Sequence, residues 1–155
     1  MTDRKRNRIS RRQFLLAASG VATGLAFEPA GATVAEMRAA ISKLVGPASV
    51  TNGRVTLELP PLVDNGNAVA LAVRVDSPMT EADHVKAIHV FTEKNPQPYV
   101  ATFRLGPRAG RARVATRVRL ADSQTVVAIC EMSDGTFWSD SVNVVVTLAA
   151  CLEEQ

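Results

Sequence analysis

The sequence contains few of the residues from which most catalytic sites are built. Its 155 residues include two histidines, two cysteines, one tryptophan and one tyrosine, and aromatic residues make up 5% of the chain. It has no Cys-x-x-Cys, His-x-x-x-His or Gly-x-Ser-x-Gly motif and no glycine-rich phosphate-binding loop. The acidic residues are scattered, so no pair of carboxylates is fixed at a distance suited to acid–base catalysis. We therefore expect no independent enzyme activity, no catalytic residues, no metal site and no cofactor.

The two histidines stand in different settings. His84 follows Asp83 in a polar segment, whereas His89 lies within an apolar run that has strand character. A surface histidine and a packed strand histidine explain these positions better than a pair of metal ligands does.

Length and charge describe one ordinary domain with a basic N-terminal end. Hydrophobic residues make up 46% of the chain and charged residues 21%, and the formal net charge is +3. The first 32 residues hold six basic and two acidic residues, or +4, which leaves 12 basic and 13 acidic residues, about −1, for the rest. Because affinity for nucleic acid comes mainly from clustered Lys and Arg, we expect no nucleic-acid partner.

The basic end has the layout of an export signal. Arg11 and Arg12 stand shortly before an apolar stretch, residues 15–27, and small residues follow at 30–32. A stretch of 13 residues at about 1.5 Å per residue is too short to cross about 30 Å of hydrocarbon. We predict that residues 1–32 are a cleaved twin-arginine signal peptide and not a membrane anchor, and that the mature protein works in the periplasm.

The mature chain begins with a helix signal. Thr33 and Glu36 have the spacing of a capping box, and Gly46 followed by Pro47 ends the pattern. Apolar residues recur on one helical face between these signals: Val34, Met37, Ile41, Leu44 and Val45. One short amphipathic helix is predicted within residues 33–47.

Further along the chain the apolar period falls to about two, which is typical of strands. Turn-forming Gly, Pro and Asn residues separate seven strand candidates, at residues 55–59, 69–75, 87–91, 99–105, 111–119, 125–132 and 137–148. This number and spacing of strands predicts a mainly β fold: an immunoglobulin-like antiparallel β-sandwich over residues 48–148, preceded by the helix.

Arginines alternate along one predicted strand: Arg111, Arg113, Arg117 and Arg119. The simplest interpretation is a solvated face, with Val114 and Val118 pointing inward. The same row is also suited to attract an anionic substrate or an acidic partner, and the sequence leaves its role open.

The two cysteines have opposite surroundings. Cys130 lies in an apolar strand, where a thiol packs as a small hydrophobic side chain and stays inert. Cys151 is the fifth residue from the C-terminus, where a thiol can be exposed. In an exported protein a disulfide between Cys130 and Cys151 is the competing hypothesis, and it would remove any chemistry from the tail.

Several segments of the chain resemble the SoxY family. They lie at residues 75–86, 88–96, 100–103, 119–122 and 131–135, and the resemblance as a whole covers about residues 35–151. SoxY is the sulfur-carrier subunit of the periplasmic thiosulfate-oxidising Sox system. The resemblance implies an immunoglobulin-like sandwich, a twin-arginine signal and a heterodimer with SoxZ.

The resemblance also implies a site. Family members carry a cysteine in a Gly-Gly-Cys-Gly-Gly tail, on which thiosulfate-derived sulfur is covalently held and presented to the Sox cytochrome, hydrolase and sulfur dehydrogenase enzymes. The matching residue here is Cys151, within a C-terminal arm at residues 149–155. The expected function is that of a carrier, with transient contacts to those enzymes.

The tail departs from the family pattern. Bulkier or charged residues replace the glycines around the cysteine and extend the chain beyond it: Ala149, Ala150, Leu152, Glu153, Glu154 and Gln155. The alanines restrict the backbone, and the acidic groups disfavour both a thiolate and an approaching thiosulfate dianion. Because exposed charges are screened within about 8 to 10 Å, we expect a slower carrier, with a non-catalytic SoxY-like interaction subunit as the alternative.

Overall fold

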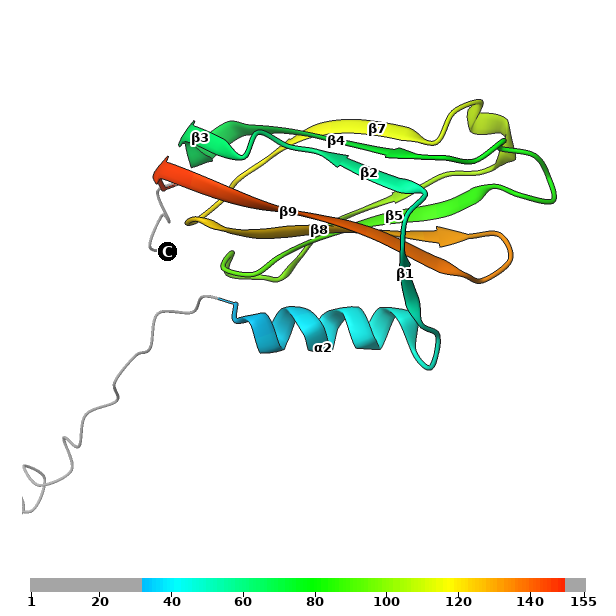
Figure 1. Cartoon of the computed structure of the whole chain (residues 1–155), viewed down its shortest axis with the longest axis horizontal. Coiled ribbons are helices and arrows are strands. Elements are labelled where there is room, and N and C mark those ends of the chain that lie inside the picture. Colours follow the sequence, from blue (N-terminus) through cyan, green and yellow to red (C-terminus); the bar gives the residue numbers. More distant parts are fainter. Residues whose placement is uncertain (1–31, 150–155) are drawn as a thin grey trace, which may run out of the picture.

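Two β-sheets pack face to face, and one helix covers the outer side of the larger sheet (Figure 1). The computed structural model describes residues 32–149. The larger sheet has the order β1-β9-β8-β5-β6, with β3 also paired to β9, and the smaller sheet has the order β2-β4-β7. The predicted mainly β, sandwich-like fold is confirmed.

The chain contributes one helix, α2 (Val34–Val45), two short 3-10 helices, η1 (Gly66–Ala68) and η2 (Pro107–Ala109), and nine strands. The strands are β1 (Val50–Asn52), β2 (Val55–Glu58), β3 (Leu62–Asn65), β4 (Val69–Val75), β5 (Val85–Thr92), β6 (Tyr99–Arg104), β7 (Arg113–Val118), β8 (Gln124–Met132) and β9 (Phe137–Leu148). No helix in this described part of the chain is long and apolar enough to span a membrane.

Helix α2 forms as its capping residues predict. The Thr33 hydroxyl accepts a hydrogen bond from the Glu36 amide at 3.2 Å, and the Glu36 carboxylate accepts one from the Thr33 amide at 2.7 Å. The helix ends at Gly46, whose φ of 59° lies in the region that favours glycine. The predicted short N-terminal helix is therefore confirmed.

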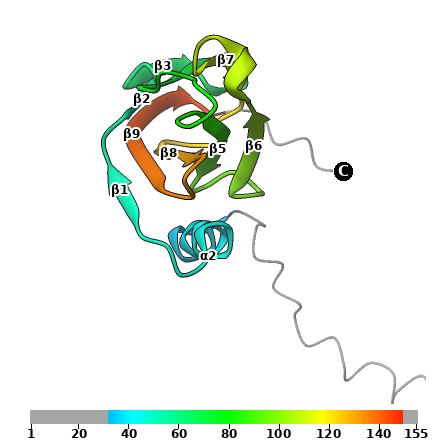
Figure 2. The same cartoon turned by 90° about the vertical axis from the view of Figure 1, so that its right-hand side faces the viewer.

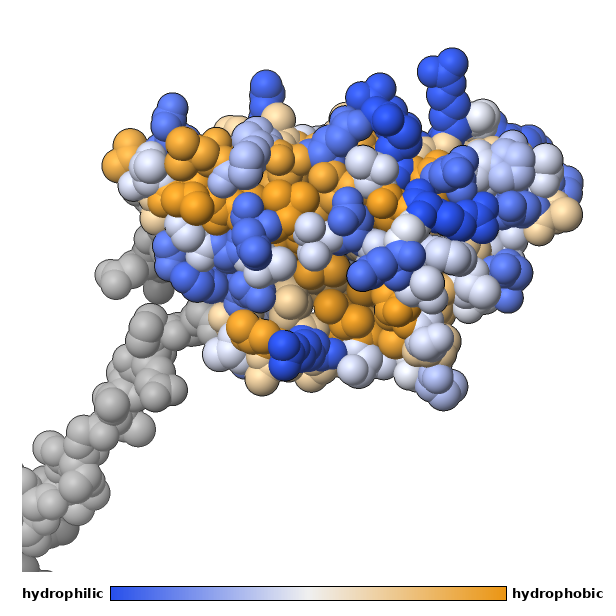
Figure 3. Space-filling model, in the orientation of Figure 1, coloured by the Kyte–Doolittle hydropathy of each residue, from blue (hydrophilic) through white to orange (hydrophobic). Residues whose placement is uncertain are grey.

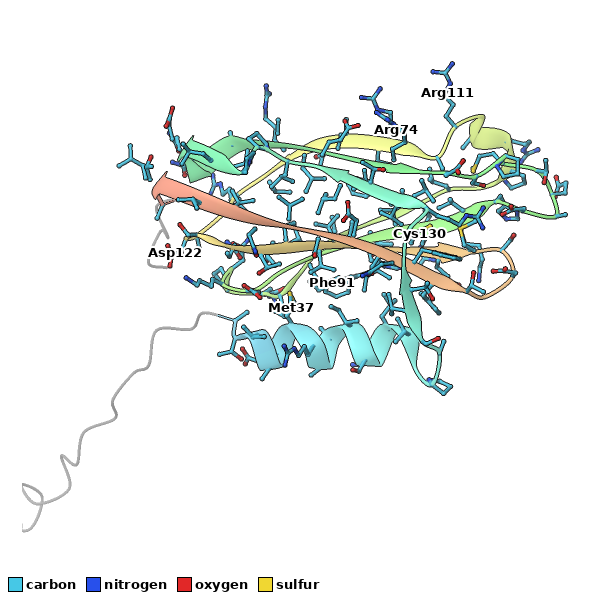
Figure 4. The ribbon with its side chains drawn as sticks, in the orientation of Figure 1. Met37, Arg74, Phe91, Arg111, Asp122 and Cys130 are labelled. Atoms are coloured by element: carbon cyan, nitrogen blue, oxygen red, sulfur yellow. The ribbon has the colours of Figure 1, made fainter. Side chains whose placement is uncertain are left out.

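The helix packs through a narrower face than the sequence predicts. Helix α2 lies against the larger sheet (Figure 2), and its buried Met37 lies on the side of Phe91 (Figure 4). Met37 and Phe91 form one cluster with Ile129 and Phe137 of the sheet. Val34 is 42% exposed and takes no part in this cluster, so its predicted place on the buried face is wrong. It occupies the first position of α2, beyond the edge of the contact that begins at Met37.

Strand residues alternate between buried and exposed positions, and the buried ones form the core between the two sheets. In β4, Val69, Leu71, Val73 and Val75 are buried while the residues between them are not. Strand β5 is buried along nearly its whole length because it is an inner strand of the larger sheet, between β6 and β8, with the second sheet on one side and helix α2 on the other. This position explains the continuous apolar run at residues 87–91.

Two strands were not predicted, β1 and β3, and both run parallel to β9. They are three and four residues long and mostly exposed, so they carry no readable alternation. Their place is set by long-range pairing with β9, which no local sequence pattern encodes. Strand β7 is also shorter than predicted, Arg113–Val118 in place of 111–119, but its alternation is confirmed: Arg111, Arg113, Arg117 and Arg119 are exposed.

Asp140 of β9 ties the two sheets together, and its removal should destabilise the fold. Its carboxylate accepts a hydrogen bond of 2.8 Å from the amide of Leu57 in β2, a buried residue. An Asp140→Ala substitution leaves that amide without an acceptor, so we expect a loss of about 1 to 3 kcal/mol in the free energy of unfolding. Urea denaturation of the variant measures it.

Asp64→Ala is the matched control for Asp140→Ala. Asp64 is exposed, and its side chain makes no hydrogen bond or ion pair within residues 32–149. Its substitution should change the free energy of unfolding by less than about 0.5 kcal/mol. Equal losses in the two variants would contradict the structural role assigned to Asp140.

Candidate functional site

The C-terminal end of β9 is held firmly where the predicted arm begins. Val145 donates its amide hydrogen to the Pro61 carbonyl at 2.8 Å, and the Val146 amide donates to the Ser123 hydroxyl at 2.9 Å. Thr147 adds a hydrogen bond of 3.0 Å from its hydroxyl to the Asp64 carbonyl. The chain is thus fixed up to the residue before Leu148.

The surface around this point is apolar. Three large hydrophobic side chains are exposed there, Leu62, Val145 and Leu148, and the register pairs Leu62 with Val145. Figure 3 shows the apolar surface at this end of the molecule. Ala149, the first residue of the predicted arm, is exposed beside it.

Cys151 lies outside the described residues, so the structure does not test its predicted role. The rest of the arm that follows Ala149, residues 150–155, lies outside them too. The structure does define where β9 ends, at Leu148, and Cys151 follows three residues later in the sequence.

Cys130 is enclosed in the core between the sheets. It is fully buried, between Ile88 of β5 and Trp138 of β9, with its sulfur 3.5 Å from that of Met132. Burial raises the pKa of the Cys130 thiol to about 12, because the thiolate loses its hydration there. The predicted inert, packed cysteine is confirmed.

The competing disulfide between Cys130 and Cys151 is wrong, because Cys130 is a free thiol. Strand geometry gives the reason. Trp138 lies opposite Cys130, and β9 continues for ten residues to Leu148, which at about 3.4 Å per residue is about 34 Å. The three residues from Leu148 to Cys151 can recover only about 10 Å of that distance. A disulfide needs the two alpha carbons within about 7 Å.

The two histidines lie as predicted and do not form a site together. His84 is half-buried in the loop before β5, with Nδ1 3.0 Å from the Thr80 carbonyl oxygen. His89 is buried in β5, its Nδ1 2.9 Å from the Tyr99 hydroxyl, and burial is the main cause that lowers its pKa. In the described part of the chain, no three His, Cys, Asp or Glu side chains gather where they could hold a metal ion.

Arg54 holds the loop between β4 and β5, and sequence reasoning missed it. Its guanidinium donates to both carboxylate oxygens of Asp83, at 3.0 and 3.2 Å, and to the Asp76 carbonyl at 2.9 Å. It also lies 5.8 Å from the centre of the Trp138 ring. These partners are 22 residues or more away in the sequence, so no local spacing signals them.

The fold belongs to a class of β-sandwiches that carry different functions. Among solved structures, the chain resembles the sulfur carrier protein SoxY from Chlorobium limicola f thiosulfatophilum, with a TM-score of 0.62 and 24% identity over 75% of this chain and 100% of that one. It also resembles a superoxide reductase (neelaredoxin) from Ignicoccus hospitalis, with a TM-score of 0.54 and 17% identity over 61% of this chain and 80% of that one. At such identities the likeness establishes the fold alone.

The sequence itself decides the family. Residues 41–151 match the family described as sulfur oxidation protein SoxY. The chain therefore belongs to the SoxY family, as the resemblance of its segments predicted. A search of curated proteins gave no match.

Proposed function

We propose that this protein is a covalent sulfur carrier that holds thiosulfate-derived sulfur on Cys151. The observation that carries the proposal is that the family match extends to Cys151, while the only other cysteine is fully buried. The carrier needs to present one sulfur atom to several enzymes. A cysteine three residues beyond a fixed strand end is suited to that task.

The chemistry begins with a bond between two sulfur atoms. The Cys151 thiol and the outer sulfur of thiosulfate join into an S-thiosulfonate, with the loss of one proton and two electrons to the Sox cytochrome. Water then attacks the terminal sulfonate sulfur in the hydrolase, which releases sulfate and two protons and leaves a persulfide on Cys151. The sulfur dehydrogenase oxidises this remaining sulfur further. The carrier contributes no catalytic group to these steps.

The partner and the compartment follow from the same proposal. The carrier pairs with SoxZ as a heterodimer, and residues 1–32 export it to the periplasm by the twin-arginine route. The paired Arg11 and Arg12 and the apolar stretch at residues 15–27 support the export route.

The altered tail supports a second candidate function. Leu152, Glu153 and Glu154 stand where the family pattern has glycine or no residue, which disfavours entry into enzyme pockets that accept backbone alone. In that case the protein is a non-catalytic interaction subunit that binds SoxZ without carrying sulfur.

Complementation separates the two candidates. A sulfur-oxidising bacterium that lacks its own SoxY and expresses this chain should regain thiosulfate-dependent oxygen uptake. In the same cells the chain should appear in the periplasmic fraction and co-purify with SoxZ. Export and SoxZ binding without oxygen uptake would contradict the carrier and support the interaction subunit.

A further inference from the structure

The outer surface of the smaller sheet carries a regular pattern of arginines and alanines. The register places Thr56, Arg74 and Arg113 in one row across β2, β4 and β7. The next rows on this side are Glu58, Ala72 and Ala115, and then Ala70 and Arg117. We call these eight residues the arginine face. Figure 4 shows Arg74, with Arg111 beside the face, projecting away from the larger sheet and helix α2.

The centre of this face is low and open. Ala70, Ala72 and Ala115 form a floor without long side chains, under a shallow groove of about 480 Å³. A second shallow groove of about 520 Å³ lies between Arg54, Arg74, Arg111 and Arg113. A partner can therefore approach the sheet closely while arginines surround it.

Positive charge dominates the rim. Arg74, Arg113 and Arg117, with the neighbouring Arg111, stand against one acidic residue, Glu58, a net charge of +3. Glu58 forms an ion pair with Arg74 and lies 3.9 Å from Arg113. Arg111 and Arg117 form no ion pair within residues 32–149.

We propose that the arginine face is a docking surface for an acidic segment of a partner protein. Charge complementarity favours such an occupant because Arg111 and Arg117 have no acidic partner within residues 32–149, and Arg74 and Arg113 share the single carboxylate of Glu58. A single small anion in the groove between Arg74, Arg111 and Arg113 would leave Arg117 unused, because Arg117 lies about 13 Å from Arg113 along β7. Single-stranded nucleic acid also fits less well, because the face has no aromatic side chain on which bases can stack.

The size of the face indicates a transient contact. Strands of four, seven and six residues, about 4.8 Å apart, offer about 280 Å², below the roughly 800 Å² per partner of stable complexes. Docking should therefore be weak, fast and sensitive to salt. This inference does not rest on Cys151, so its failure would leave the carrier proposal untouched.

Residue-resolved NMR of the full chain tests the docking surface. The probe is a 12-residue peptide of alternating glutamate and serine, blocked at both ends and titrated into ¹⁵N-labelled protein at low salt. We expect amide shifts concentrated on β2, β4 and β7. A position-resolved signal is needed because residues 1–32 also carry positive charge.

Three variants make the test quantitative. Arg113→Gln with Arg117→Gln should weaken peptide binding five- to tenfold. Arg38→Gln with Lys43→Gln makes the same charge change on exposed positions of α2, across the molecule from β7 (Figure 1), and should change binding less than twofold. Glu58→Gln removes the one acid on the face and should tighten binding at least twofold.

Each contrary result would overturn the proposal. One is peptide shifts centred on other elements; another is equal weakening in the helix control. Thiosulfate producing the same saturable shifts at the same concentrations would identify a small-anion site instead. The ¹⁵N spectrum shows whether the double variant of β7 is folded. If it is not, the proposal is tested by the wild-type shift map and by the change in peptide affinity of the Glu58→Gln variant.

Discussion

Replacing Cys151 with serine should abolish thiosulfate oxidation in a cell that contains no other SoxY. A serine hydroxyl cannot form the sulfur–sulfur bond on which the proposed chemistry begins, and the fully buried thiol of Cys130 cannot substitute for it. We expect thiosulfate-dependent oxygen uptake to fall at least a hundredfold, to the background of a strain without SoxY. Export and binding to SoxZ should be unchanged, because neither depends on the thiol.

Cys130→Ala is the matched control for Cys151→Ser. It removes the other sulfur of the chain from a packed site beside Ile88 and Trp138, so it should lower the free energy of unfolding by about 1 to 2 kcal/mol. Oxygen uptake should persist in cells that contain the folded variant. Normal oxidation by Cys151→Ser, or loss of oxidation in a stably folded Cys130→Ala protein, would contradict the assignment of the carrier cysteine.

The two thiols should also differ by more than a thousandfold in their rate of alkylation. Thiolate is the reactive form, and with a pKa of about 12 the Cys130 thiol has about one thiolate in ten thousand molecules at pH 8. An exposed cysteine in a peptide, with a pKa of about 8.5, has roughly one in four. Because Cys130 is also fully buried, the alkylating reagent cannot reach it in the folded protein, which slows its reaction further.

Peptide-resolved labelling with iodoacetamide measures the difference in the native, unreduced protein. Cys151 should be labelled within minutes, and Cys130 only after the domain is unfolded. Raising the pH from 7 to 9 should still leave Cys151 as the labelled residue of the native protein, because a thiol with a pKa of about 12 has only about one thiolate in a thousand molecules at pH 9 and Cys130 is also buried. Comparable rates at the two cysteines would refute the burial of Cys130 in solution.

Sequence patterns predicted the elements that obey local rules. The capping box of Thr33 and Glu36 and the alternation in β4 required only neighbouring residues, and both are confirmed. Strands β1 and β3 escaped prediction because they are short and are placed by parallel pairing with β9. Val34 was assigned to the buried face because the periodicity of a helix does not show where the contact with the sheet begins.

At the candidate site, too, local sequence predicted some features, and others became clear only from the three-dimensional structure. The apolar surroundings of Cys130 predicted a packed thiol, and the structure confirms it. The length of β9, which separates Cys130 from the arm by about 34 Å, was needed to remove the disulfide alternative. The sequence offered no sign of Arg54 as the anchor of the β4–β5 loop, because its contacts join distant segments. The role of Cys151 rests on the family and stays a prediction.

The intact mass of the mature protein from thiosulfate-fed cells, measured with and without reductant, tests the carrier proposal most directly. The proposal predicts added mass that corresponds to sulfur or thiosulfate, that is lost on reduction and that maps to the peptide containing Cys151. A bare Cys151 thiol in cells that are oxidising thiosulfate through this protein would contradict it.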